Sequence, residues 1–192
     1  MAADDPIGVF DSGVGGLSVL HDVRRELPHE HLLYVADSVH APYGDRTQAF
    51  VEARSIAIVR FLVTQGAKAI VVACNTATSM AVDALRSEFS LPCVAMEPAV
   101  KPAVSITKSG VIGVLATTAT LSSPRFARLV SHFGSDVDVV LQACPGLVEH
   151  VEKGELAHDA TRALVEQYVR PLVARGADTL VLGCTHYPFL AT

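Results

Sequence analysis

The chain has 192 residues, a formal net charge of -5 and 50% hydrophobic residues. This length and composition allow one large domain or two small lobes with a substantial buried core. The negative charge and the scattered lysines and arginines offer no basic surface, so we expect no nucleic-acid partner. No apolar run approaches the ~20 residues needed to span a bilayer, and the N-terminus lacks a signal-peptide pattern, so we expect a cytoplasmic protein with no membrane partner.

Apolar runs alternate with amphipathic segments in the first half of the chain. The expected strands cover residues 7–10, 32–36, 69–73 and 93–96. The expected helices between them cover residues 17–27, 47–65 and 77–89. Alternation of strand and helix predicts a mostly parallel sheet flanked by helices.

The second half restarts the same pattern. Its expected strands cover residues 111–115, 137–141 and 179–183, with helices at 123–133 and 158–174. The stretch 97–110 contains two prolines and a glycine and is interpreted as the crossover between lobes. We therefore predict an α/β protein of two pseudo-symmetric lobes, residues 1–99 and 100–192, with the active site between them.

Two segments 110 residues apart follow the same pattern, and in each a cysteine stands where the expected strand ends. Residues 63–76 and 173–186 both run from a helix through a Gly-Ala turn and an apolar strand to Cys74 or Cys184. Two thiols at equivalent strand ends favour chemistry on both faces of one carbon. The second copy has no counterpart of the strand at 93–96, which predicts either a smaller lobe or a fragment that lacks its C-terminal return to the first lobe.

The strand ends are also where open α/β sheets bind ligands. Asn75 and Thr76 after Cys74 favour a helix start, and the positive end of a helix favours the thiolate form of a nearby cysteine. Cys93 and Cys144 are expected to be structural. With no C-x-x-C pair and no ligand spacing among the histidines, we predict neither a disulfide framework nor a metal site.

A glycine-rich turn follows Asp11 and Ser12, and its backbone donors favour a bound carboxylate or phosphate. Dinucleotide binding, with Asp37 on a ribose, is an alternative. It fails in detail because Ser18 replaces the third glycine of the motif and Asp11 would repel a pyrophosphate. Helix capping by Ser12 remains compatible with the pattern. His186 is either a proton carrier beside Cys184 or a surface histidine.

Several blocks resemble the signature of the cofactor-independent glutamate racemases in the aspartate/glutamate racemase family. They are Val9-Phe-Asp-Ser-Gly-Val-Gly-Gly-Leu17, Asp37 with Ala41-Pro-Tyr-Gly44, Val71-Val-Ala-Cys-Asn-Thr-Ala-Thr78 and Leu182-Gly-Cys-Thr-His-Tyr-Pro188. The resemblance covers nearly the whole chain. Ser38-Val-His40 and Ala36 depart from the usual family residues but only flank the contact positions.

The resemblance implies that Cys74 and Cys184 are the two acid/base residues. It implies that Asp11 assists Cys74, and that Glu152 and His186 assist Cys184. The implied substrate contacts are Asp11, Ser12, Tyr43, Gly44, Asn75, Thr76, Thr118, Thr185 and His186. It further implies glutamate as the substrate, no cofactor such as pyridoxal phosphate, and a role in supplying D-glutamate for peptidoglycan.

Other readings stay open at this point. Similar paired-cysteine folds act on aspartate, hydantoins or maleate, and a shortened, weakly active racemase-like protein would serve as a binding partner. The oligomeric state is open too, a homodimer being one option.

Overall fold

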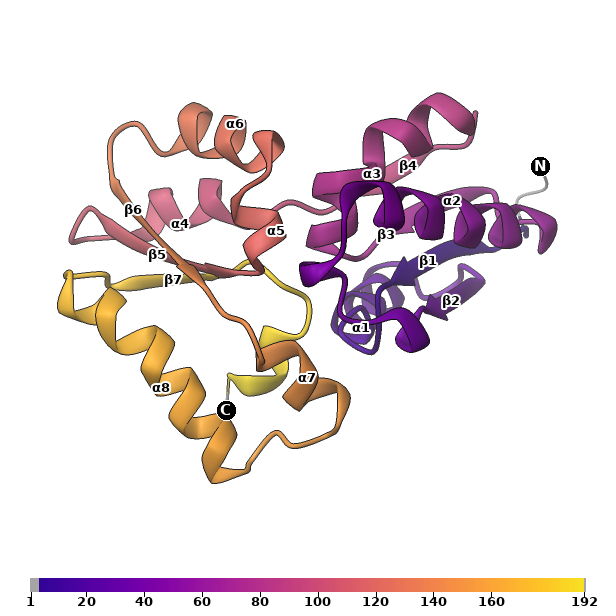
Figure 1. Cartoon of the computed structure of the whole chain (residues 1–192). Helices are drawn as coiled ribbons and strands as arrows, with labels where there is room; N and C mark the ends of the chain where they lie inside the picture. Colours follow the sequence, from indigo (N-terminus) through magenta and orange to yellow (C-terminus); the bar gives the residue numbers. More distant parts are fainter. Residues whose placement is uncertain (1–3, 192) are drawn as a thin grey trace.

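The computed structural model describes residues 4–191 and contains two parallel sheets, each flanked by helices (Figure 1). This arrangement confirms the predicted α/β class. We call the elements from β1 to β4 the first lobe and those from α4 onward the second lobe. The boundary near residue 100 stays a prediction.

The first lobe is built on a four-stranded sheet in the order β2-β1-β3-β4. Its strands are β1 (Ile7–Asp11), β2 (Leu32–Ala36), β3 (Ala69–Val72) and β4 (Cys93–Ala95). Its helices are α1 (Leu17–Glu26), α2 (Gln48–Thr64) and α3 (Asn75–Glu88), with short 3₁₀ turns η1 (Ser38–His40) and η2 (Tyr43–Asp45).

The second lobe is built on a three-stranded sheet in the order β6-β5-β7. Its strands are β5 (Val111–Ala116), β6 (Asp138–Ala143) and β7 (Thr179–Leu182). Its helices are α4 (Val100–Ile106), α5 (Thr118–Leu121), α6 (Pro124–Phe133), α7 (Leu147–Glu152) and α8 (Asp159–Ala174), followed by the 3₁₀ turn η3 (Tyr187–Leu190).

The two sheets share one topology. Strands β2-β1-β3 and β6-β5-β7 have the same order and are parallel throughout, and the central strands carry the same Ile-Gly-Val sequence. Among the described residues, β4 has no counterpart in the second sheet. The internal repeat in the sequence therefore corresponds to a repeated three-strand unit.

The helix that precedes each repeated strand ends in the same way. Gly66 and Gly176 adopt φ of 83° and 90°, a left-handed conformation that glycine adopts without steric cost. The residue after each glycine donates its N–H to the carbonyl of Leu62 or Leu172, five residues earlier, closing a Schellman motif. This local signal makes the chain turn back into β3 and β7 at equivalent points.

The segment 97–110, interpreted as the crossover between lobes, contains helix α4, which the sequence analysis did not predict. Its buried Val100 and Ala103 pack against the second sheet, next to Ile112 and Val181. Pro102 does not prevent this helix because it lies in the first turn, where a backbone N–H has no helical partner. Helix α7, which carries Glu152, was also not predicted.

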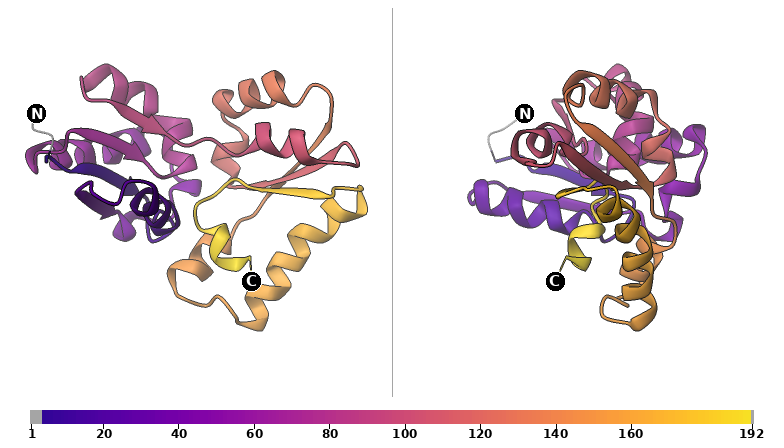
Figure 2. Two further views of the ribbon diagram at one scale, coloured as in Figure 1. Left: turned by 180° about the vertical axis from the view of Figure 1, so that it is seen from behind. Right: turned by 90° about the vertical axis from the view of Figure 1, so that its left-hand side faces the viewer.

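The central strands of the two sheets point their carboxyl ends at the boundary between the lobes, as Figure 1 and the view from behind in Figure 2 show. Apolar cores lie farther out. One core lies between the first sheet and helices α2 and α3, and two cores cover the opposite faces of the second sheet. Within residues 4–191, no helix is long and apolar enough to cross a membrane.

Candidate active site

A small pocket lies between the lobes and contains both repeated cysteines. Residues from the ends of β1, β3, β5 and β7 and from the η2 turn surround it. Its lining is Ser12, Pro42, Tyr43, Gly44, Cys74, Asn75, Thr76, Thr117, Val148, Cys184, Thr185 and His186. The two thiols therefore reach one pocket from opposite lobes.

Cys74 lies at the N-terminus of helix α3, as the sequence predicted, and is itself the capping residue. Its Sγ accepts the N–H of Ala77 at 3.4 Å, and its thiol donates toward Ser12 Oγ at 3.8 Å. Burial raises the pKa of Cys74 well above its usual range, and the charge of Asp11 raises it further. The hydrogen bond from the Ala77 N–H opposes these effects only in part. The prediction that the helix start favours a Cys74 thiolate is therefore wrong for the protein without substrate, in which Cys74 is a thiol.

Asp11 lies behind the pocket and is fully buried. Its Oδ2 accepts the N–H groups of Gly13 and Gly16 at 3.3 and 2.9 Å, and its Oδ1 accepts the hydroxyl of Thr185 at 3.4 Å. Burial raises the pKa of Asp11, opposed by His186 and by these backbone donors. The carboxyl group thus supports the floor of the pocket beside Cys74.

Cys184 follows β7 and faces His186, which is 1% exposed. The distance from Cys184 Sγ to His186 Nδ1 is 3.7 Å, and His186 Nε2 donates to Glu152 Oε1 at 2.6 Å. Burial lowers the pKa of His186, but the hydrogen bonds to Cys184 and Glu152 outweigh burial and raise it to about 10. His186 is therefore an imidazolium at neutral pH, and both ring nitrogens are donors.

Glu152 comes from α7 and joins the two lobes. Its Oε1 accepts the N–H of Val14 in the first lobe at 2.8 Å as well as the His186 proton. Burial raises the pKa of Glu152, but the bonds from His186 and Val14 outweigh burial and hold it below the usual value. Glu152 is a carboxylate that stabilises the charge on His186 from outside the pocket.

Protein carboxylates accept three of the backbone N–H groups in the glycine-rich turn. Asp11 takes the N–H groups of Gly13 and Gly16, and Glu152 takes that of Val14. The glycines instead provide room for side chains of the second lobe. A Cβ on Gly13 would lie 1.7 Å from Glu152 Oε1, and one on Gly15 would lie 2.3 Å from His186 Nδ1.

The dinucleotide alternative fails for a second reason. Asp37, the residue that would bind a ribose, is fully engaged by protein groups. Its carboxylate accepts hydrogen bonds from Arg54 and Tyr43 and lies 2.9 Å from His40 Nδ1.

The structure brings most of the expected site residues together. Nine line the pocket, namely Ser12, Tyr43, Gly44, Cys74, Asn75, Thr76, Cys184, Thr185 and His186. Asp11 and Glu152 lie directly behind it. Thr118 is exposed and lines a neighbouring pocket with Pro145 and Glu149 instead.

Thr117 was missed by the sequence analysis. Its Oγ1 lies 3.0 Å from Thr76 Oγ1 across the lobes, and it also caps α5 by accepting the N–H of Thr120. The signal was present, because Thr117 follows β5 as Ser12 follows β1 and stands three residues before Thr120, a helix-capping spacing. Val148 and Pro42, which also line the pocket, carry no comparable signal.

The other two cysteines are free thiols that do not line this pocket, although Cys144 lines the neighbouring one. Cys144 donates to the carbonyl of Gln142, and burial raises its pKa to about 12. Burial also raises the pKa of Cys93. Among the residues that the structure describes, no three His, Cys, Asp or Glu side chains gather in a way that would hold a metal ion.

Comparison with known proteins assigns the chain to a class. The profile of the family described as Asp/Glu/Hydantoin racemase matches residues 7–192. The chain belongs to this family.

Individual relatives agree over nearly the whole chain. A glutamate racemase from Methylococcus capsulatus is 60% identical over 188 residues, which are 98% of this chain and 69% of that protein. The solved structure of glutamate racemase isoform RacE1 from Bacillus anthracis superposes with a TM-score of 0.89 at 37% identity, covering 99% of this chain and 72% of that one. The Escherichia coli glutamate racemase was solved with L-glutamate and the activator UDP-MurNAc-ala. It superposes with a TM-score of 0.88 at 37% identity, covering 97% of this chain and 72% of that one.

Proposed function

We propose that this protein interconverts L- and D-glutamate without a cofactor, by a two-base proton transfer at the α-carbon. The observation that supports this best is that Cys74 and Cys184 come from equivalent strand ends of two lobes and line one pocket. A carbon held between them has one sulfur on each face. One thiolate can then remove the α-proton while the opposite thiol delivers another.

The charges around the pocket suit such a division of roles. His186, as an imidazolium, presents its Nδ1–H to Cys184, and a positive donor stabilises negative charge on sulfur. Cys74 lies beside buried Asp11 and keeps its proton. In one direction Cys184 takes the α-proton and Cys74 protonates the opposite face; the reverse reaction exchanges the roles.

The intermediate carbanion needs its charge delocalised into the α-carboxylate and stabilised there. The hydroxyl and amide groups of Ser12, Asn75, Thr76 and Thr185 line the pocket, and α3 begins at its wall. We propose that these groups and the backbone of Gly44 hold the substrate carboxylates. Asp11 acts through Thr185 and Cys74, and Glu152 acts through His186, rather than on the substrate itself.

Glutamate is the favoured substrate because the relatives at 56–60% identity are glutamate racemases and one solved relative binds L-glutamate. Aspartate, hydantoins and maleate are the rivals within the family. Incubating the protein with glutamate and with each rival in D2O, followed by NMR, tests the choice. We expect deuterium at the α-carbon of glutamate. Preferential labelling of aspartate or a hydantoin, or turnover of maleate, would instead identify that compound as the substrate.

The two-base mechanism is tested with Cys74→Ser and Cys184→Ser, using circular dichroism to follow racemisation. Each variant should lose about 10²- to 10⁴-fold in rate, the usual worth of a positioned acid or base. Each retains one thiol, so exchange of the α-proton in D2O should persist for one enantiomer only, and for opposite enantiomers in the two variants. Near wild-type racemisation by both would sink the mechanism.

We further propose that the D-glutamate serves peptidoglycan synthesis and that the reaction takes place in the cytoplasm, where the mechanism's thiols stay reduced. A homodimer stays a prediction, to be measured by sedimentation.

A further inference from the structure

The η2 turn forms one wall of the pocket and touches the opposite lobe. Tyr43 and Gly44 both line the pocket. Gly44 lies so close to the second lobe that a Cβ on it would be 3.0 Å from Thr117 Cβ. A small shift of this turn would therefore change both the shape of the pocket and its closure against Thr117.

The turn is held mainly through the side chain of Tyr43. The ring is 1% exposed and packs in the first-lobe core with Phe10 and Val51. Its hydroxyl donates to Asp37 Oδ2 at 2.6 Å, a short bond of the charge-assisted kind. Within the turn itself, one backbone bond of 3.1 Å from Arg46 to Tyr43 closes the 3₁₀ helix.

Asp37 is in turn fixed by the first sheet and by helix α2. It follows β2 directly, and its N–H donates to the carbonyl of Asp11 at 3.1 Å. Arg54 binds its carboxylate with two parallel bonds, Nε to Oδ2 at 3.0 Å and Nη2 to Oδ1 at 2.8 Å. Burial raises the pKa of Asp37, but the hydrogen bonds with Arg54, Tyr43 and His40 outweigh the effect of burial. The pKa of Asp37 is therefore below its usual value. Asp37 is therefore a carboxylate although it is 8% exposed.

Arg54 supplies the charge that this arrangement needs. Glutamate carries two carboxylates and one ammonium group, so an uncompensated carboxylate behind the pocket wall would repel it. The bidentate guanidinium neutralises Asp37 and fixes its orientation, which a lysine would do less well. Arg54 does not line the pocket, so any effect on the substrate must pass through Asp37 and Tyr43.

We infer that Asp37 and Arg54 are positioning residues, an ion pair behind the pocket that holds the Tyr43–Gly44 wall in place and thereby sets the affinity for glutamate. The inference rests on the proposed function, because it takes this wall to contact the substrate.

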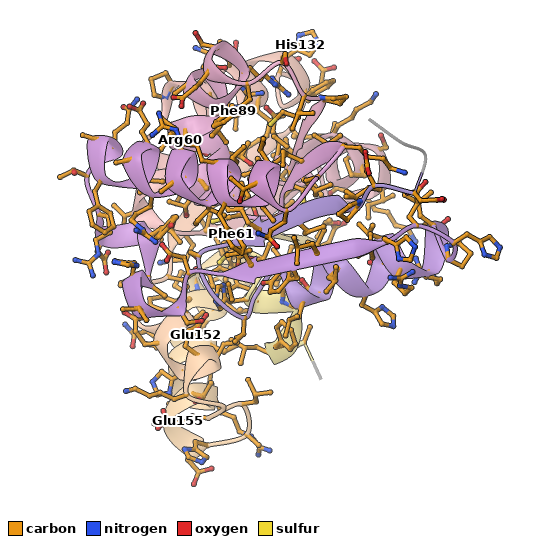
Figure 3. All side chains as sticks on the ribbon, turned by 90° about the vertical axis from the view of Figure 1, so that its right-hand side faces the viewer. Arg60, Phe61, Phe89, His132, Glu152 and Glu155 are labelled. Atoms are coloured by element: carbon orange, nitrogen blue, oxygen red, sulfur yellow. The ribbon has the colours of Figure 1, made fainter. Side chains whose placement is uncertain are left out.

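The test compares Arg54→Gln with Arg60→Gln on the same helix. Arg60 forms an exposed ion pair with Glu88 at 2.6 Å and does not line the pocket. Figure 3 labels it on α2, well apart from Glu152. We expect Arg54→Gln to raise KM for glutamate about tenfold, the scale of a lost charge-assisted hydrogen bond, with kcat within about threefold. Arg54→Lys should recover part of the loss, and Arg60→Gln should change neither constant.

Thermal melts separate positioning from folding. An equal fall in melting temperature for both glutamine variants with unchanged KM in both would overturn the inference. If Arg54→Gln does not fold, Tyr43→Phe and Asp37→Asn take its place, because each removes hydrogen bonds while keeping the shape of the side chain. They too should raise KM more than kcat falls, and unaltered KM in both contradicts the inference.

Calorimetric titration with glutamate distinguishes this inference from the proposed function. A wild-type protein that binds glutamate without racemising it overturns the proposed reaction only, and the Kd of the Arg54→Gln variant then decides the inference. Racemisation by the wild type with equal Kd values for wild type and Arg54→Gln overturns the inference only. If the wild type neither binds nor racemises glutamate, both the proposed function and the inference are overturned.

Discussion

Cys74 and Cys184 occupy equivalent positions in the two lobes, yet their surroundings differ in charge. Asp11 ends β1 beside Cys74, whereas the equivalent residue at the end of β5 is Ala116. Two residues after Cys184 stands His186, an imidazolium, whereas Thr76 stands two residues after Cys74. The repeat of the fold places the two sulfurs, and the residues that break the repeat put an acidic group beside Cys74 and a basic group beside Cys184.

His186→Gln removes the positive charge from the Cys184 side and should be the strongest test of this asymmetry. We expect racemisation to fall by about 10²- to 10⁴-fold. Wild-type activity should decline as pH rises through about 10, where the imidazolium loses its proton, and the variant should lack this alkaline limb. A decline at the same pH in the variant would assign the limb to another group.

Gly15→Ala tests whether the first lobe must leave room for His186. The new Cβ would lie 2.3 Å from Nδ1, so either the ring or the lobe has to move. A displacement of about 1 Å in a catalytic group costs about 10²-fold in rate. Gly66→Ala is the matched variant: it meets no atom within 4 Å but has φ of 83°, so it should cost about 1 kcal/mol of stability and little activity. Equal activity of the two variants would contradict the steric argument.

The buried imidazolium should also be visible in stability. The pKa of His186 is raised from 6.5 to about 10 on folding, so its contribution is complete below about 6.5 and is lost as pH rises to about 10. The free energy of unfolding of the wild type, measured with urea, should therefore fall across this range by a few kcal/mol more than that of His186→Gln. Parallel curves for the two proteins would mean that His186 is not charged in the folded state.

Cys144→Ala should have the smallest effect. This thiol lies outside the pocket and holds its proton, with a pKa of about 12. We expect racemisation within about twofold of wild type and a stability loss of about 1–2 kcal/mol from the deleted buried sulfur. A large loss of activity would show that a third cysteine belongs to the site.

Much of the fold was predictable because its signals are local. Gly66 and Gly176 mark the helix ends before β3 and β7, and the apolar runs after them fix where Cys74 and Cys184 emerge. The same signals placed most of the pocket residues. Helix α4 was missed because Pro102 suggests a loop unless it is known to lie in a first turn.

What remained unpredicted depends on contacts between residues far apart in the chain. The protonated state of Cys74 follows from burial and from Asp11, and these outweigh the helix end that the sequence displays. The bond between Thr117 and Thr76 exists only when the two lobes meet. The glycine-rich turn misled for the same reason, since the groups that take its donors include Glu152, 138 residues away from Val14.

Gly13 and Gly15 have a consequence for how such a protein can diverge. Glu152 and His186 occupy the space that a Cβ on Gly13 or Gly15 would need. These two backbone positions of the first lobe therefore form part of the binding surface for side chains of the second lobe. The halves of this repeat are therefore not interchangeable modules. A hybrid that combines halves from two relatives must inherit the glycines and the Glu–His pair together, or its lobes will not close.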